Sequence, residues 1–244
     1  MTTLLLVRHG LTELTGPVLA GWTPALPLDE RGRAQAAAVA ARLAGLPLAA
    51  VVSSPLDRCL QTAEAIAAAR RGSAGGSGGG SGAAEVKVEV DERFGEVRYG
   101  DWTGRPLKEL AEEPLWRVVQ AHPSAARFPG PDGESLAAAQ HRAVAAVRDW
   151  NARVAAEHGP GAAYLVCSHG DIIKAIVADA LGMHLDQFQR IEAGPASLTV
   201  IRYTELRPFL VRLNDTGGDV GGLLPAPDTP AAGGQGDAAV GGGA

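Results

Sequence analysis

The chain has 244 residues, of which 22 are basic and 27 acidic, giving a formal net charge of −5. This length suits one well-cored α/β domain or two small ones. The acidic balance, with no run of Lys or Arg, excludes the electrostatic signature of a nucleic-acid-binding protein. No apolar stretch approaches the roughly 20 residues that a membrane span requires. With two cysteines and no recognisable signal peptide, the sequence predicts a cytoplasmic protein without a disulfide framework.

Glycine is abundant at 32 residues, but most of the excess lies in two stretches. The first, 71–84, is rich in Gly and Ser and lies between a predicted helix and a predicted strand, so we expect a flexible loop insertion. The second, 214–244, contains mostly Gly, Pro, Ala and Asp without periodicity, which predicts a disordered tail. We therefore expect a single folded domain over residues 1–213, with the insertion hanging from the edge of the sheet opposite the functional site.

The predicted elements alternate along the chain between short apolar strands and Ala-rich helices. Strands are expected at 4–7, 49–52, 85–90, 162–167, 198–203 and 209–213. Helices are expected at 29–43, 56–69, 134–156 and 171–181, the second capped by Ser53-Ser54 with Pro55 at its first position. This order predicts an α/β fold with a doubly wound, mainly parallel sheet and helices on both faces.

Charged and polar residues follow four of the predicted strands. Arg8 and His9 follow the first strand, Arg58 lies in the first turn of the helix after the second, 92–96 contains two glutamates, and His169 follows the fourth. The carboxyl ends of parallel strands form one edge of a sheet, where ligands bind. We therefore expect two imidazoles, two guanidiniums and a carboxylate to converge on one cleft.

This set of side chains suits phosphate chemistry. Guanidiniums match the oxygens of a phosphate group, and Gly10 would let the backbone approach a ligand closely. A neutral imidazole can attack phosphorus while a second, protonated imidazole stabilises the charge on the phosphoryl oxygens. A carboxyl group can protonate the leaving alkoxide and then deprotonate a water. The sequence has no HxH, CxxC, HExxH or P-loop spacing, so we expect no metal ion and no other cofactor.

Five motifs in order carry a resemblance to a known family: LLLVRHGLTE, SSPLDRCLQTAEAI, ERFGEVRYGDWTG, PDGESL and LVCSHGDIIKAI. Together with their predicted strand and loop contexts over residues 4–213, they resemble the histidine phosphatase (phosphoglycerate-mutase-like) superfamily. The resemblance implies that residues 1–213 form a catalytic domain of that kind. It also implies that catalysis needs no metal and passes through a phosphohistidine.

The resemblance assigns roles to five residues. It implies that His9 is the phosphorylated nucleophile and that Glu96 is the proton donor. Arg8, Arg58 and His169 would form the phosphate pocket.

The chain departs from the family pattern at two positions. Thr15 stands where the family often has Asn, and Asp171 follows the SHG motif where Gly is common. An acid at this helix start stabilises the helix but would weaken the binding of strongly anionic substrates. The acid motif resembles the E-x-x-x-G-x-W-x-G pattern of the phosphatase branch, and this favours a phosphatase over a mutase.

Several assignments stay open. Glu92 is the rival of Glu96 as the acid, and Glu134 either caps the following helix or reaches the pocket. Thr15 binds substrate or belongs to an ordinary loop, and Trp22 either lines the substrate cleft or packs behind it. The remaining histidines are expected to be structural or exposed: His122, His141, His158 and His184. Buried, inert thiols are expected at Cys59 and Cys167, with redox sensing as the alternative.

The sequence therefore predicts a phosphomonoester hydrolase that acts through a phosphohistidine on a small phosphorylated metabolite. One alternative is a phosphomutase of the phosphoglycerate mutase type, and another is a non-catalytic module that binds a phosphorylated ligand. A mutase would convert phosphoglycerate to its isomer without releasing phosphate. The only partner expected is the small phosphorylated substrate, without nucleic acid or membrane. Oligomers are possible, and the sequence names no particular substrate.

Overall fold

The computed structural model describes residues 1–73 and 87–218, and in this part of the chain six strands form one sheet. Their order in space is β3-β2-β4-β1-β5-β6. Strands β1 to β4 pair in parallel, whereas β5 runs antiparallel to both β1 and β6. This confirms the mainly parallel sheet. The strand bounds are β1 Thr2–Arg8, β2 Leu48–Ser53, β3 Val88–Val90, β4 Ala163–Ser168, β5 Leu198–Tyr203 and β6 Pro208–Asp215.

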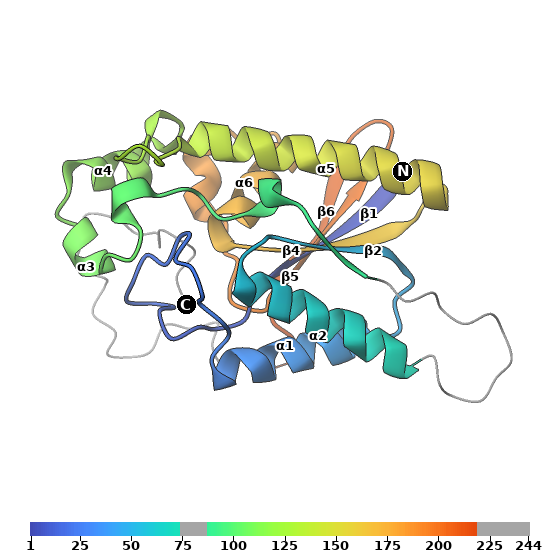
Figure 1. Ribbon diagram of the computed structural model, residues 1–244. Helices are drawn as coiled ribbons and strands as arrows, with labels where there is room; N and C mark the ends of the chain where they lie inside the picture. Colours follow the sequence, from blue (N-terminus) through green and yellow to red (C-terminus); the bar gives the residue numbers. More distant parts are fainter. Residues whose placement is uncertain (74–86, 219–244) are drawn as a thin grey trace, which may run out of the picture.

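Helices cover both faces of this sheet, as the sequence predicts. Figure 1 shows α1 and α2 side by side on one face and the long α5 with α6 on the other. The α-helices are α1 Glu30–Leu43, α2 Asp57–Ser73, α3 Leu107–Leu110, α4 Pro114–Ala121, α5 Leu136–His158 and α6 Gly170–Ala180. Four short 3-10 helices are η1 Glu92–Phe94, η2 Gly100–Trp102, η3 Pro123–Ala125 and η4 Leu185–Arg190.

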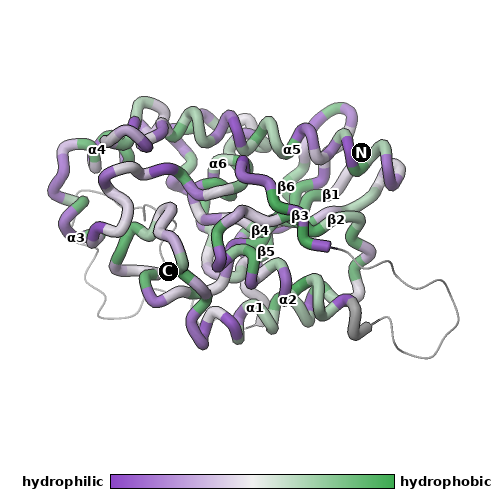
Figure 2. Tube along the Cα trace, viewed as in Figure 1, coloured by the Kyte–Doolittle hydropathy of each residue, from purple (hydrophilic) through white to green (hydrophobic). Residues whose placement is uncertain are grey.

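The sheet separates two hydrophobic clusters, one under each helical layer. In β1, Leu4 and Leu6 contribute to the cluster beneath α5 and α6, while Leu5 and Val7 contribute to the cluster beneath α1 and α2. Successive strand side chains point to opposite faces, so a strand buried on both sides is apolar throughout. Figure 2 shows this hydrophobic band between the two helical layers. Burial on both faces of the sheet thus explains why all four residues from Leu4 to Val7 are apolar.

All four predicted helices start one or two residues from their predicted positions, at Glu30, Asp57, Leu136 and Gly170, and two of these differences involve residues with an expected capping role. Helix α2 begins at Asp57, so Pro55 precedes the helix and is not its first residue. Ser54 caps the turn before it, because its Oγ accepts a hydrogen bond from the Leu56 N–H at 3.3 Å. Helix α5 begins at Leu136 after the N-cap Ser135, so Glu134 does not cap it.

The predicted insertion and tail lie mostly outside the described residues. Helix α2 continues through Ser73, so the first three positions of the predicted insertion 71–84 are helical. Strand β6 reaches Asp215, two residues beyond the predicted end of the domain. The rest of the insertion, the first two residues of the predicted strand 85–90, and residues 219–244 fall outside the described part. Within that part, no helix has both the length and the apolar character needed to cross a bilayer.

Candidate active site

The site lies at the carboxyl edge of the parallel strands. In Figure 1, β1 runs from the labelled N-terminus toward this edge. Strands β1 and β4 end in register, with Arg8 opposite Ser168, so the next residues of both strands meet. The His9 N–H donates to the Ser168 carbonyl at 3.1 Å, and the rings of His9 and His169 lie 5.1 Å apart. The predicted convergence of the two imidazoles is therefore correct.

The hydrogen bonds of His9 define which of its ring nitrogens carries the proton. Its Nδ1 lies 2.7 Å from the Gly10 carbonyl oxygen, which can only accept, so Nδ1 carries the proton. Its Nε2 accepts a hydrogen bond from Arg58 Nε at 3.2 Å. Burial, and then the positive charges of Arg58 and Arg8, hold the pKa of His9 well below its usual value. His9 is therefore a neutral imidazole whose Nε2 bears a lone pair.

Gly10 serves a purpose different from the expected one. A Cβ at Gly10 would lie 2.5 Å from the carbonyl oxygen of Gly32, in the first turn of α1. The close approach that requires glycine is thus between backbone segments of the protein and not toward a ligand. The Gly10 N–H donates to Thr62 Oγ1 at 3.2 Å, and its carbonyl orients His9. Gly10 thus positions His9.

Two buried guanidiniums line the pocket beside His9. Arg8 and Arg58 are each 2% exposed. Arg8 Nη1 donates to the Ala193 carbonyl at 2.8 Å, and Arg58 Nη2 donates to the Gly21 carbonyl at 2.7 Å. Arg58 Nη1 is buried and has no hydrogen-bond partner among the described residues. Because a buried charged donor without a partner is costly, Arg58 Nη1 is placed to bind an anion.

His169 is held by hydrogen bonds on both ring nitrogens. Its Nε2 lies 2.7 Å from Ser54 Oγ, and its Nδ1 accepts from Arg58 Nη2 at 3.3 Å. Burial and then the charge of Arg58 hold the pKa of His169 well below its usual value. The expected protonation of this second imidazole beside a bound phosphate anion stays a prediction. Neutral His169 orients Arg58 and Ser54 at the pocket.

Glu96 is the carboxyl group of the pocket. It lines the pocket and is 3% exposed, whereas its rival Glu92 is exposed on η1. Burial, followed by the negative charge of Asp171, raises the pKa of Glu96 to about 7. The carboxyl group can therefore donate a proton near neutral pH and accept one after ionising.

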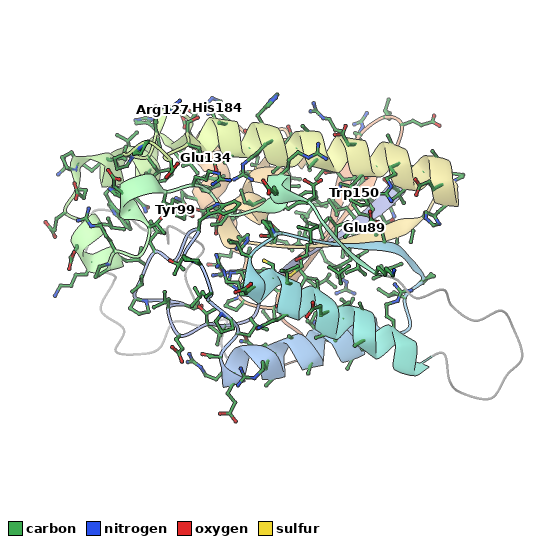
Figure 3. All side chains as sticks on the ribbon, viewed as in Figure 1. Glu89, Tyr99, Arg127, Glu134, Trp150 and His184 are labelled. Atoms are coloured by element: carbon green, nitrogen blue, oxygen red, sulfur yellow. The ribbon has the colours of Figure 1, made fainter. Side chains whose placement is uncertain are left out.

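The loop that carries Glu96 is fixed through its backbone. The Glu96 carbonyl oxygen accepts hydrogen bonds from Trp22 Nε1 at 2.5 Å and from Arg142 Nη2 at 2.9 Å. Arg142, on α5, pairs with Glu134 at 2.6 Å. Trp22 thus packs behind Glu96 and does not line the pocket. Glu134 binds Arg142 and does not line the pocket either. Figure 3 shows Glu134 beside Tyr99, at the end of the sheet away from Glu89 of β3.

A buried polar pair lies next to Glu96 and was not predicted. Tyr99 lines the pocket, and its hydroxyl donates to Asp171 Oδ2 at 2.9 Å. Asp171 is 1% exposed and also accepts from Lys174 Nζ at 3.3 Å. The carboxylate of Asp171 is therefore compensated inside the protein and does not line the pocket. The spacing of Lys174 three residues after Asp171 on a helix was the available signal.

The pocket itself measures about 420 Å³, including space open to solvent. Thr15 lines the pocket, which was one of the two alternatives left open for this residue. Its Oγ1 also accepts a hydrogen bond from the Thr12 N–H and contacts the Thr12 hydroxyl, both at 2.9 Å. Thr15 thus also closes its own loop. The lining residues are Arg8, His9, Thr12, Thr15, Gly16, Val18, Leu19, Ala20, Gly21, Arg58, Glu96, Tyr99 and Leu107.

The exposure of the other histidines and the burial of both cysteines agree with the expectations from the sequence. The four remaining histidines are exposed. Cys59 and Cys167 are buried and free, and burial, with a contact to Cys59, raises the pKa of Cys167 well above its usual value. Inert thiols therefore remain the simpler interpretation. Among the described residues, no group of three or more His, Cys, Asp or Glu side chains could hold a metal ion.

Paired imidazoles, paired guanidiniums and a buried carboxyl group with a raised pKa, at the edge of an α/β sheet, define an enzyme site for phosphoryl transfer. The comparison with protein families agrees: the chain belongs to the histidine phosphatase superfamily (branch 1), whose model matches residues 4–216. Its relatives place it among phosphatases and phosphoglycerate-mutase-like enzymes.

Two relatives and one solved structure illustrate the similarity. The chain is 30% identical over 232 residues to phosphoserine phosphatase 1 of Hydrogenobacter thermophilus, covering 88% of this chain and 93% of the relative. It is 29% identical over 231 residues to a probable phosphoglycerate mutase of Cronobacter sakazakii, covering 93% and 95%. The structure of a phosphoserine phosphatase from Entamoeba histolytica, with 3-phosphoglyceric acid, superposes with a TM-score of 0.71 at 26% identity, covering 88% of this chain and 98% of that one.

Proposed function

We propose that this protein is a phosphomonoester hydrolase that acts on a small phosphorylated metabolite through a phosphohistidine at His9. The observation that carries the proposal is the state of His9. Its Nδ1 proton is bound by the Gly10 carbonyl, and its Nε2 lone pair faces the Arg58 guanidinium, with the charge of Arg8 also acting on the ring. A neutral nucleophile beside two fixed cations is the arrangement that in-line attack on a bound phosphate requires.

In the first step, His9 Nε2 forms a bond to phosphorus as the bond from phosphorus to the alcohol oxygen breaks. Arg8 and Arg58 bind the phosphoryl oxygens, and the buried Nη1 of Arg58 gains the partner that it lacks. Glu96 gives its proton to the leaving oxygen. Its pKa of about 7 leaves it substantially protonated at neutral pH.

In the second step, the ionised Glu96 takes a proton from a water molecule whose oxygen attacks phosphorus. The phosphorus–Nε2 bond then breaks, releasing inorganic phosphate and restoring neutral His9. Transfer to water, and not back to a second alcohol, is supported by the phosphatase-type pattern of Glu96, Gly100, Trp102 and Gly104. The H. thermophilus relative named as a phosphatase is similar over most of both chains. The two buried, free thiols fit action in the cytoplasm.

Hydrolysis of p-nitrophenyl phosphate tests the proposal. Wild type should release nitrophenol and inorganic phosphate in equal amounts, with and without added glycerol or glycerate as acceptors. His9→Asn should release neither above background. If phosphate falls short of nitrophenol when an acceptor is present, the enzyme is a phosphotransferase of the mutase type. If His9→Asn retains turnover, His9 is not the nucleophile.

A further inference from the structure

Positive charge in the pocket is confined to the part that binds the phosphoryl group. Of the residues that line the described pocket, only Arg8 and Arg58 carry a positive charge, and both flank His9. The rest of the lining consists of glycines, two threonines, Tyr99, the acid Glu96 and the aliphatic side chains of four residues. Beyond these two guanidiniums, the lining of the described pocket therefore offers no further cation to pair with a second anionic group of a substrate.

Four other cations on the elements around the pocket are engaged elsewhere, and Lys108 is exposed on α3 and does not line the pocket. The guanidinium of Arg98 stacks on the Trp22 ring at 3.9 Å, and Arg105 pairs with Glu113 at 2.8 Å. Arg142 pairs with Glu134 at 2.6 Å. Lys174 is 3% exposed and bound to Asp171. Recruiting one of them to a substrate carboxylate would break an existing interaction.

The outer wall of the pocket is apolar and held in place by backbone contacts. We call Val18, Leu19, Ala20 and Leu107 the apolar rim. Val18 forms a β-bridge with Pro106, and the Leu107 N–H donates to the Pro17 carbonyl at 2.9 Å. The Leu19 N–H donates to the Arg105 carbonyl at 3.0 Å. The rim is thus a built surface that joins two segments far apart in the sequence.

We infer that the substrate is a phosphomonoester whose alcohol portion carries no negative charge and places apolar surface against this rim. The inference rests on the proposed function and narrows it. A carboxylate against the rim would lose water without gaining a cationic partner, which disfavours its binding. Apolar surface against the rim is stabilised by the removal of water from both. Phosphoserine and 3-phosphoglycerate, which carry a carboxylate beside the phosphate, are accordingly poor substrates for this chain.

A matched set of substrates tests the inference. Glycerol 3-phosphate and 3-phosphoglycerate differ only in a hydroxymethyl group against a carboxylate, and phenyl phosphate supplies an apolar group. We expect kcat/KM to fall in the order phenyl phosphate, glycerol 3-phosphate, 3-phosphoglycerate, with the last at least about tenfold below the second, as expected when a buried group lacks its partner. Equal or better hydrolysis of 3-phosphoglycerate would overturn the inference while leaving the hydrolase proposal standing. Failure on all three, phenyl phosphate included, would overturn the proposed function itself.

A pair of variants at Leu107 tests whether the apolar rim causes the discrimination against a substrate carboxylate. Leu107→Arg puts a guanidinium on the rim, and Leu107→Gln puts a long uncharged side chain there. We expect the ratio of kcat/KM for 3-phosphoglycerate to that for glycerol 3-phosphate to rise several-fold in Leu107→Arg relative to Leu107→Gln, because only the first offers the carboxylate a partner. The same ratio in both variants would contradict the role of the rim.

Discussion

Arg58 Nε donates a hydrogen bond to Nε2 of His9 across 3.2 Å, so the cation that would bind phosphate also holds the nucleophile. The same guanidinium contacts Nδ1 of His169 at 3.3 Å. One side chain from the first turn of α2 therefore links the ends of β1 and β4. Burial, and after it the positive charge of Arg58, lowers the pKa of both imidazoles, so Arg58 helps to keep them neutral as well as oriented.

Replacing Arg58 by Lys should lower kcat/KM by about 10²–10³-fold, the usual cost of losing a positioned donor to developing charge. An ammonium keeps the charge but cannot contact His9, His169 and a phosphoryl oxygen at once. Steady-state kinetics with p-nitrophenyl phosphate measure the loss. Arg31→Lys, at a 69% exposed side chain on α1, is the matched control and should behave as wild type. Comparable rates in the two variants would remove Arg58 from the mechanism.

The importance of Glu96 should depend on the leaving group. Glu96→Gln preserves the shape of the side chain but cannot donate a proton, so kcat/KM for glycerol 3-phosphate should fall by about 10²–10⁴-fold. The kcat/KM for p-nitrophenyl phosphate should fall much less, because nitrophenolate leaves without protonation. Equal losses for both substrates would show that Glu96 supports the structure and is not the acid.

Alkaline pH should slow the first chemical step, in which His9 attacks phosphorus and Glu96 protonates the leaving oxygen. That step needs protonated Glu96, whose pKa burial and Asp171 raise to about 7 while Arg58 and Arg8 oppose the rise. The value of kcat/KM for glycerol 3-phosphate should therefore decline as pH increases through about 7. On the acid side, activity should persist below the ordinary histidine pKa of about 6.5, because the pKa of His9 is lowered.

Asp171→Asn should move the alkaline limb of this profile to lower pH, because it removes a negative charge that raises the pKa of Glu96. The Tyr99 hydroxyl can still donate to the amide oxygen, whereas the Lys174 ammonium loses its carboxylate partner and keeps its hydrogen bond to Gln189. Asp132→Asn, at an exposed position, is the control and should leave the limb in place. If the alkaline limb of the profile is unchanged in Asp171→Asn, or moves to higher pH, the charge of Asp171 does not raise the pKa of Glu96.

Gly10→Ala should destabilise the fold by about 1–3 kcal/mol, the usual cost of overpacking. Its Cβ would lie 2.5 Å from the Gly32 carbonyl oxygen. Gly45→Ala is the control, because a Cβ there has no atom within 4 Å. It should leave stability unchanged or raise it slightly. Urea denaturation measures both. A Gly10→Ala protein as stable as Gly45→Ala would show that the close approach to α1 is not required.

The sequence predicts the layered α/β fold because its strands are short apolar runs and its helices are long and Ala-rich. The adjacency of His9 and His169 also follows from the sequence, since each residue comes directly after a parallel strand. These inferences need only local patterns and one topological rule. The helix start at Glu134 was wrong because the side-chain cap of α5 is the next residue, Ser135. The predicted cap Ser54 is present, but α2 begins at Asp57, two residues beyond Pro55.

Contacts between distant segments could not be predicted in this way. Arg142 belongs to none of the motifs, yet its guanidinium binds the backbone of the loop that carries Glu96. Trp22 was expected as one alternative to line the cleft, but its indole N–H is used to hold that loop from behind. The partner of Gly10 is likewise a helix start 22 residues away in the sequence, at Gly32. Each of these roles depends on three-dimensional packing.

A phosphoenzyme trapped at His9 would test the central claim most directly. Wild type mixed with ³²P-labelled phenyl phosphate and quenched in alkali within milliseconds should carry label that is stable to base and lost in acid, as expected of a phosphohistidine. Mass spectrometry should place the phosphoryl group on His9, and His9→Asn should remain unlabelled. Rapid hydrolysis of phenyl phosphate without such an intermediate, or label on a residue other than His9, would contradict the account.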